Sequence, residues 1–408
     1  MKKLHAIPVY LVITFAFGLL RSILFTLDMV YFVTVVRLNP LQLVLVGTTL
    51  EATVFLFEIP TGVMADVYSR RLSTIIGYAL MGLGFLVEGS LPVFGVVLLA
   101  QVVWGLGWTF TSGAESAWIA DEVGEGRVAP VYLRGAQFGQ LGGLLGIPIS
   151  VVLGSQRLNL PILTGGALFL VLAAFLAACM PETGFRAVQA EERRSWHVLF
   201  GTLHDGVDLV RTRPLLLTFL AVVLFLGLSS EGYDRLWTAH ILANFSFPAL
   251  GHWSTPAWFG ILRAGSMLLT LAATEVARRR LSATGAATLR VLQFLCGLMV
   301  ASLLVLAILA YWCFGMLRQT AYPLSEGWVN QHIESRVRAT VLSMTSQLDS
   351  FGQIIGGPIV GAIGTAWGLR AALSTSALIL SPTAWLYACL RRQAGCTAEH
   401  AETAEGQR

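Results

Sequence analysis

Residues 61–73 read TGVMADVYSRRLS, and residues 270–282 repeat this pattern as TLAATEVARRRLS. Aligned without gaps, the two segments share threonine, valine, two arginines, leucine and serine. The aspartate of the first segment aligns with the glutamate of the second. A second echo links FGQ at 138–140 to FGQ at 351–353. Each echo precedes a glycine-rich run that ends near a proline. The repeat therefore predicts two related halves, joined end to end in one chain.

The composition is that of a membrane protein. Of the 408 residues, 55% are hydrophobic and 12% are charged, whereas soluble proteins carry about 25% charged residues. A chain this apolar has too little polar surface to cover a core in water, which excludes a soluble enzyme, a nucleic-acid binder and a disordered chain. Long unbroken apolar runs favour helices over a β-barrel, whose short strands alternate apolar and polar residues.

Basic clusters and span length together define the topology. A span needs about 20 apolar residues, and loops rich in arginine and lysine stay in the cytoplasm. The clusters from Lys2–Lys3 to Arg391–Arg392 leave six intervals, each with room for two crossings. This predicts an all-α membrane protein with twelve helices, both termini in the cytoplasm, and a tight turn near Leu303–Leu306. The expected spans are 8–36, 41–66, 72–90, 92–119, 129–154, 160–181, 214–242, 252–277, 285–304, 305–329, 338–363 and 367–391.

The spans divide the chain into two six-helix bundles, which the repeat predicts to be pseudo-symmetric. Residues 1–183 form the first bundle and residues 214–392 the second. The linker 184–213 carries apolar residues at helical spacing, which predicts an amphipathic helix on the membrane surface. The polar tail 393–408 is expected to be disordered. Repeats of this kind place the substrate site near the bilayer midplane, between the halves.

A charged motif follows the second helix. Gly62 permits close helix packing, and Asp66 lies beside a turn. Arg70–Arg71 can reach acids on a neighbouring loop, where Asp121–Glu122 are available. Such ion pairs would latch one conformation and open in the other. The alternative to a latch is that the arginines only follow the positive-inside rule and that the motif caps a helix. In the second half, Glu275 and Arg279 are expected to form a weaker copy of the latch.

The segment 61–73 resembles the signature loop between helices two and three of the major facilitator superfamily. GQLGGLLGIP in helix five and GQIIGGP in helix eleven resemble the glycine–proline motif of that superfamily's drug–proton antiporters. The ending MPET at 180–183 is also similar. The resemblance covers the whole chain, although Gln101 and Trp104 replace an arginine and a glutamine often present in helix four, and Ile147 interrupts the helix-five motif.

The resemblance implies an alternating-access secondary transporter with residues 62–71 as the gating loop. The most similar branch is the bacterial antibiotic efflux pumps of the tetracycline and macrolide type. It implies a monomer in the bacterial cytoplasmic membrane that exchanges a small-molecule drug for protons. The sequence holds no GxxxxGK[ST] motif for ATP, no metal-ligand spacing and no clustered nucleophile. We therefore expect no cofactor, no metal, no nucleic-acid partner and no enzymatic activity.

Charged side chains inside the spans need a partner or a function, because a charge at the bilayer centre costs about 3 kcal/mol. Arg21 with Glu51, and Arg318 with Asp349, are expected to form ion pairs at similar depth. Structural pairing, proton binding and recognition of substrate charge all stay open, with Glu51 and Asp349 as the leading proton carriers. The candidates are Arg21, Glu51, Arg263, Arg318 and Asp349 near the midplane, with Asp28 and Glu231 toward the outside.

Aromatic rings in two spans are candidates for lining a cavity, since flat rings suit large amphipathic ligands. Packing and interfacial positions are the alternative. The rings are Trp104 and Trp108 in helix four, and Tyr311, Trp312 and Phe314 in helix ten. With few polar groups at mid-depth, the sequence favours a drug exporter over a nutrient, sugar or lysolipid transporter or a membrane sensor.

Overall fold

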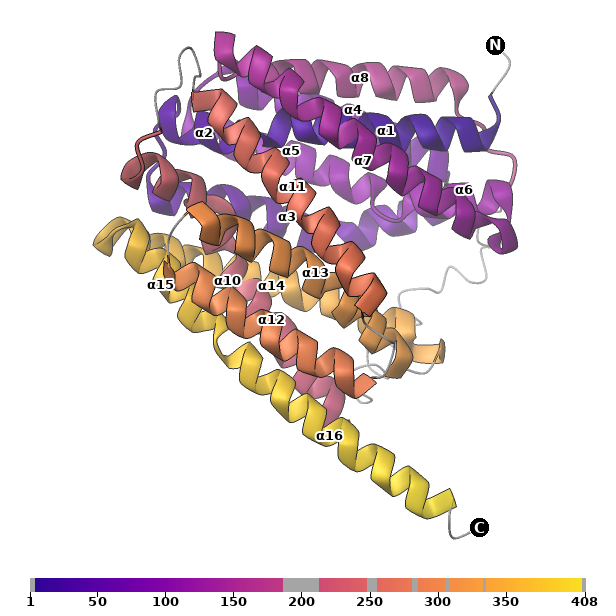
Figure 1. Ribbon diagram of the computed structural model, residues 1–408. Helices are drawn as coiled ribbons and strands as arrows, with labels where there is room; N and C mark the ends of the chain where they lie inside the picture. The colour runs from indigo at the N-terminus through magenta and orange to yellow at the C-terminus, as the bar shows by residue number, and fades with distance from the viewer. Residues whose placement is uncertain are drawn as a thin grey trace. The chain divides into compact units, whose positions relative to one another are not determined.

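The structure, a computed structural model, describes residues 4–185, 213–247, 255–280, 285–305, 308–332 and 335–405. Within these ranges every regular element is a helix (Figure 1). Before the linker lie α1 (Ala6–Phe25), α2 (Asp28–Thr34), α3 (Pro40–Val67), α4 (Arg70–Ser90), α5 (Phe94–Thr111), α6 (Ala114–Val123), α7 (Glu125–Gln156) and α8 (Leu160–Cys179). After it lie α10 (Pro214–Asn244), α11 (Thr255–Arg280), α12 (Gly285–Val305), α13 (Ile308–His332), α14 (Ser335–Trp367), α15 (Leu369–Leu380) and α16 (Pro382–Glu405).

The helices agree with the expected spans, each of which coincides with one long helix or with two consecutive ones. In the described part of the chain, ten segments are long and apolar enough to cross a membrane. Helices α13 and α14 are not among them, because they carry polar residues such as Arg318 and Asp349. The predicted all-α membrane fold is confirmed.

Helix breaks follow local backbone chemistry. Gly113 has a φ of 74° and separates α5 from α6 within the expected span 92–119. Only glycine adopts this left-handed region without strain. Helix α12 ends at Val305 and α13 begins at Ile308, and the turn expected near residues 303–306 falls in part on residues outside the described ranges. The start of α3 is capped, because the Asn39 side chain accepts a hydrogen bond from the Gln42 amide.

The chain forms two compact units. The first comprises Met1–Arg193 and Leu242–Ala264, and the second comprises Arg194–Ile241 and Gly265–Arg408. The boundary after Arg193 falls in the expected linker, whereas the assignment of Leu242–Ala264 to the first unit does not follow the expected bundles. In the first unit α1 packs on α7, and α4 lies between α5 and α8. In the second, α12 contacts α13, α15 and α16.

The two glycine-rich runs make equivalent contacts, each within its own unit. In the first unit, a Cβ atom at Gly142 of α7 would overlap the backbone of α1 at Phe15. In the second, a Cβ atom at Gly352 of α14 would lie 2.8 Å from the carbonyl oxygen of Leu224 in α10. Glycine permits such close backbone approach in membrane helices. The repeated glycine-rich segment in the sequence thus corresponds to a repeated close contact between helices.

Two expectations about the polar segments have different outcomes. The tail 393–408 was expected to be disordered, but α16 continues through it to Glu405 (Figure 1). The segment is rich in alanine and glutamate, which favour helix, and it extends a helix that has already begun. The amphipathic helix expected in the linker 184–213 lies almost wholly outside the described residues.

Candidate functional site

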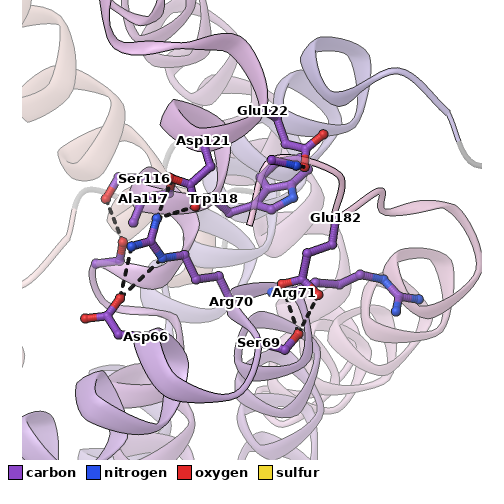
Figure 2. A network of polar contacts seen from close by, with 12 residues as sticks. Asp66, Ser69, Arg70, Arg71, Ser116, Ala117, Trp118, Asp121, Glu122 and Glu182 are labelled. Carbon is purple, nitrogen blue, oxygen red and sulfur yellow. Dashed lines mark hydrogen bonds and ion pairs between the residues drawn. The ribbon is translucent and has the colours of Figure 1, made fainter. Parts of the chain in front are cut away.

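Arg70 is the centre of a polar network where α3 ends and α4 begins (Figure 2). Its Nε and Nη2 donate to Asp66 Oδ1 at 3.2 and 3.1 Å, and its Nη1 donates to the Ala117 carbonyl oxygen at 3.1 Å and to Asp121. The side chain of Arg70 is 20% exposed, so water screens these ion pairs only in part. We call Asp66, Arg70 and Asp121 the latch; it joins α3, α4 and α6.

Arg71 and Glu122 do not follow the expected pairing. Arg71 donates from Nη2 to the Ala177 carbonyl oxygen at 2.6 Å, at the end of α8. Glu122 accepts hydrogen bonds from the Thr183 hydroxyl at 2.7 Å and from the Gly184 amide at 2.7 Å. Of the two acids expected to meet an arginine, only Asp121 does so. Glu122 instead holds the chain that leaves α8.

Glu182 belongs to the network and was not singled out from the sequence. Its carboxylate accepts from the Ser69 hydroxyl at 2.7 Å and from the Arg71 amide at 2.9 Å (Figure 2). Ser69 also caps α4 by accepting from the Leu72 amide. Glu182 therefore occupies the N-terminus of α4, where a helix dipole favours an anion. The signal was present in the ending MPET, whose glutamate follows the last residues of the sixth span.

Gly62 does not have the packing role expected from the motif. A Cβ atom at this position would meet nothing within 4 Å. The close approach of helices in this region occurs instead between α4 and α5, where a Cβ atom at Gly77 would lie 2.7 Å from the Gly107 carbonyl oxygen. The spacing of the motif specifies a glycine on α3, but the neighbouring helix does not approach it.

The second copy of the motif forms ion pairs within one helix. Glu275 accepts from Arg278 Nε at 2.7 Å and from Arg279 Nε at 2.6 Å, all on α11. The two arginine side chains are 71% and 72% exposed. The pair Glu275–Arg279 has the same i, i+4 spacing as Asp66–Arg70. It differs in that Arg70 also reaches a second helix.

In the second unit, Arg318 of α13 is bound by a different acid from the one expected. Its Nη1 donates to both carboxylate oxygens of Asp234 in α10, at 2.9 and 2.8 Å. Asp349 of α14 accepts from Gln353 Nε2 at 2.9 Å and interacts with Arg318 electrostatically. The expected pair Arg318–Asp349 is thus corrected to a cluster of one arginine and two aspartates.

The expected pair of Arg21 and Glu51 is also corrected. Within the described residues, Arg21 has no carboxylate partner, and the charge acting on it is the second cation Arg263. The side chain of Arg21 is exposed, and that of Arg263 is half-buried. Glu51 is half-buried in α3 and interacts with other groups. Similar depth does not make a pair, because two helices can present their side chains in different directions.

The outer candidates Asp28 and Glu231 are buried, and each accepts a hydrogen bond from a residue close to it in the chain. Asp28 accepts a hydrogen bond from the Met29 amide at 2.7 Å at the start of α2. Glu231 accepts from Arg235 Nε at 3.3 Å, one turn further along α10. Glu88, which was not singled out, is 2% exposed and accepts from Gln101 Nε2 at 2.8 Å. The sequence gave no indication that Glu88 would be buried, because it lies near the end of its expected span.

The candidate aromatic residues divide into partly accessible and buried ones. Trp108 is 37% exposed, whereas Phe314 is 2% exposed and packs on Tyr233 with ring centroids 4.1 Å apart. Phe314 is therefore part of the core and not a lining residue. Trp104 is half-buried and donates from its indole nitrogen to Gln101 at 3.0 Å.

Tyr311 and Trp312 of α13 are half-buried. Tyr311 stacks on Tyr233 with ring centroids 5.9 Å apart. Trp312 lies against α11, where a Cβ atom at Gly265 would be 2.8 Å from Trp312 Cζ2. Both rings therefore pack on neighbouring helices and keep part of their surface accessible.

Comparison with known proteins agrees with this architecture. The sequence pattern of the Major Facilitator Superfamily matches residues 9–348. The MFS-type transporter YxaM of Bacillus subtilis (strain 168) is 22% identical over 346 residues, which cover 83% of this chain and 85% of YxaM.

Two solved structures have a similar fold. The nucleoside transporter NupG superposes with a TM-score of 0.75 at 14% identity, covering 94% of this chain and 98% of NupG. A bacterial homolog of the human lysosomal transporter Spinster superposes with a TM-score of 0.72 at 13% identity, covering 95% and 96%. At such identities the likeness concerns the fold alone. With most of its length matched by the family pattern, the chain belongs to the Major Facilitator Superfamily of membrane transporters.

Proposed function

We propose that this transporter exports amphipathic drugs, such as tetracyclines or macrolides, across the bacterial cytoplasmic membrane in exchange for protons. The observation that carries the proposal is the cluster in the second unit, where two aspartates on α10 and α14 share Arg318. One positive charge cannot neutralise two carboxylates. One of the two acids can therefore bind a proton while the other keeps the arginine paired.

Proton binding at this cluster would change the interactions between three helices. When Asp349 is ionised, it attracts Arg318 in competition with Asp234. When Asp349 is protonated, Arg318 pairs with Asp234 alone. If the pairing of Arg318 differs between two conformational states, protons bind to these states with different affinity. Such a difference in affinity is the requirement for coupling. Drug binding would draw on the same conformational equilibrium.

The latch supports an alternating cycle in the first unit. Its ion pairs join three helix ends in the conformation described, and they are exposed enough to exchange with water. Partly solvated ion pairs have small net free energies, so they can form and break during a transport cycle. Aromatic surface at Trp108 suits an amphipathic ligand.

The test is transport in proteoliposomes with tetracycline as the probe. An imposed inside-acid gradient should accelerate tetracycline uptake into the lumen, and a protonophore should abolish the acceleration. The variants D349N and D234N should lose it, and E51Q tests the first unit in the same way. E231Q, which alters a buried acid paired on α10 itself, should keep it. Uptake that ignores the gradient, or acceleration that survives D349N, D234N and E51Q, would contradict proton-driven export and favour a nutrient or lipid transporter.

A further inference from the structure

Glu115, in the first turn of α6, is a half-buried acid that takes no part in the latch. Its Oε2 accepts a hydrogen bond at 2.8 Å from the hydroxyl group of Tyr78 on α4, and the side chain of Tyr78 is 1% exposed. Within the described part of the chain, no basic side chain forms an ion pair with Glu115. A carboxylate between helices that no cation neutralises costs free energy, and binding a proton removes that cost.

Tyrosines from two further helices lie beside this contact. The Tyr132 hydroxyl of α7 donates to the Ser116 carbonyl oxygen at 2.8 Å, directly after Glu115 in the chain. Tyr10 of α1 lies edge-on to Tyr132, with ring centroids 6.1 Å apart. The start of α6 therefore lies among tyrosines from α1, α4 and α7. A tyrosine hydroxyl can bind a carboxyl group in either protonation state.

The charged side chains around α6 have other partners or are exposed. Arg70 is paired with both acids of the latch, and Glu58 accepts a hydrogen bond from the Ser112 hydroxyl at 3.2 Å. At this end of the unit, α1 and α5 carry no charged residue. The charged side chains described here on α3, α4 and α7 are Glu58, Asp66, Arg70, Arg71, Arg127 and Arg134. None of these arginines pairs with Glu115, so a proton is what can neutralise it in this conformation.

The helix α6 connects Glu115 to the latch. Asp121 follows Glu115 by six residues and pairs with Arg70 of α4 (Figure 2). On α4, Tyr78 follows Arg70 by eight residues. At about 1.5 Å per residue, the two contacts between α4 and α6 lie about 9–12 Å apart along the helices. Any movement that separates α6 from α4 therefore affects both contacts.

Glycines at both ends allow α6 to move as one piece. Gly113 has a φ of 74° and Gly124 a φ of 89°, and a Cβ atom at either position would meet nothing within 4 Å. Hinge residues of this kind absorb changes in backbone angles when an element moves. A rotation of α6 away from α4 would open the latch and bring the Glu115 carboxyl group into water at the same time.

We propose that Glu115 carries a proton in the conformation described and releases it when α6 moves away from α4. In the closed arrangement the proton is bonded to Oε1, while Oε2 keeps the hydrogen bond from Tyr78. In the open arrangement the O–H bond breaks, and the proton passes to water on the side of the latch. The helix N-terminus stabilises the carboxylate that remains. The inference rests on the proposed exchange of drug for protons, and it assigns a proton-binding residue to the first unit.

Infrared difference spectroscopy tests the assignment by measuring protonation directly. The full-length protein in phosphatidylcholine nanodiscs is titrated from alkaline to acidic buffer, and the C=O stretching band of protonated carboxyl groups is followed. One such band of the wild type should be absent in E115Q, which should fold because its amide oxygen can accept the Tyr78 hydrogen bond. In Y78F the band should remain but move to higher wavenumber, because its carbonyl oxygen has lost a hydrogen bond. The matched control is E58Q, which alters the other half-buried acid near Gly113 and should keep the band.

The variant R70A tests the link to the latch by the direction of a shift. Removing a positive charge would by itself make Glu115 easier to protonate, so that its band would appear at higher pH. Loss of the latch favours the open arrangement, in which Glu115 is ionised, so we expect the band at lower pH than in the wild type. A band at higher or unchanged pH in R70A would overturn the link.

A carboxyl spectrum that E115Q leaves unchanged, or a band that is lost in E58Q instead, would overturn the proton site. Protonation is measured without drug or gradient, so these outcomes are independent of export. If E115Q removes the band while tetracycline uptake ignores an acid gradient, the proton site stands and proton-driven export fails. If gradient-driven uptake persists while E115Q leaves the spectrum unchanged, the reverse holds.

Discussion

Removing Arg70 and removing Glu122 would break different contacts at the ends of the helices. Arg70 connects three helix ends by contacts to Asp66, the Ala117 carbonyl oxygen and Asp121. Asp121 has a partner on another helix, whereas the carboxylate of Glu122 binds the chain after α8. Removing Arg70 leaves two carboxylates without their cation, whereas removing Glu122 loosens a segment outside the latch.

We predict that R70A and D66N each reduce transport about tenfold or more, which is the effect of losing a hydrogen bond to a charged group in one of two states. Insertion into the membrane should be unchanged, because the motif lies at a helix end. Tetracycline resistance and membrane abundance are measured together in a pump-deficient host. R134Q serves as the control for loss of an exposed arginine. Full resistance in R70A at normal abundance would disprove the latch role.

At the scale of helices, glycine determines which pairs pack closely. In the first unit α7 meets α1, and in the second α14 meets α10, in both cases through the glycine-rich run. A Cβ atom at Gly356 would overlap the backbone of α10 at Leu228, as one at Gly142 would overlap α1. Backbone atoms cannot rotate away as a side chain can, so even alanine must push the helices apart.

We predict that G142A and G356A each lower the free energy of unfolding by about 1–3 kcal/mol, the usual cost of overpacking. The matched control is G297A in α12, where a Cβ atom meets nothing within 4 Å. This control should keep or slightly raise stability, because alanine favours helix over glycine. Thermal unfolding in detergent measures all three. A melting temperature of G142A equal to that of G297A would show that α1 and α7 have room to adjust.

At the scale of the whole molecule, the two halves repeat in sequence but not in their ion pairs. Asp66–Arg70 extends to α6, whereas Glu275 pairs with Arg278 and Arg279 of its own helix. Pairs within one exposed helix turn contribute little and connect no other element. The first unit therefore has the latch, and the second has the arginine with two aspartates.

This asymmetry predicts unequal effects for equivalent substitutions. E275Q should reduce tetracycline transport by less than about threefold, since an exposed ion pair is worth little. D66N, at the aligned position, should reduce it far more. Both are compared in proteoliposomes at equal protein content. Equal losses would mean that the second copy of the motif connects to another element in a different conformation.

The sequence by itself determined the helices and their order. Hydrophobic length and basic clusters specify spans because the bilayer requires a fixed length of apolar helix and the cytoplasm retains positive loops. It also predicted that Arg70 would meet Asp121, although Asp121 lies within α6 and not on the loop that was expected. The breaks at Leu27 and Gly113, and the helical tail up to Glu405, were not expected.

Tertiary structure alone decided which charges meet. Position along a helix can be read from the sequence at about 1.5 Å per residue, and this placed Arg21 and Glu51 at similar depth. The direction in which a side chain points depends on how neighbouring helices pack, and hydropathy contains little information about it. Packing therefore paired Arg318 with Asp234, left Arg21 without a carboxylate partner among the described residues, and left Gly62 without a close neighbour.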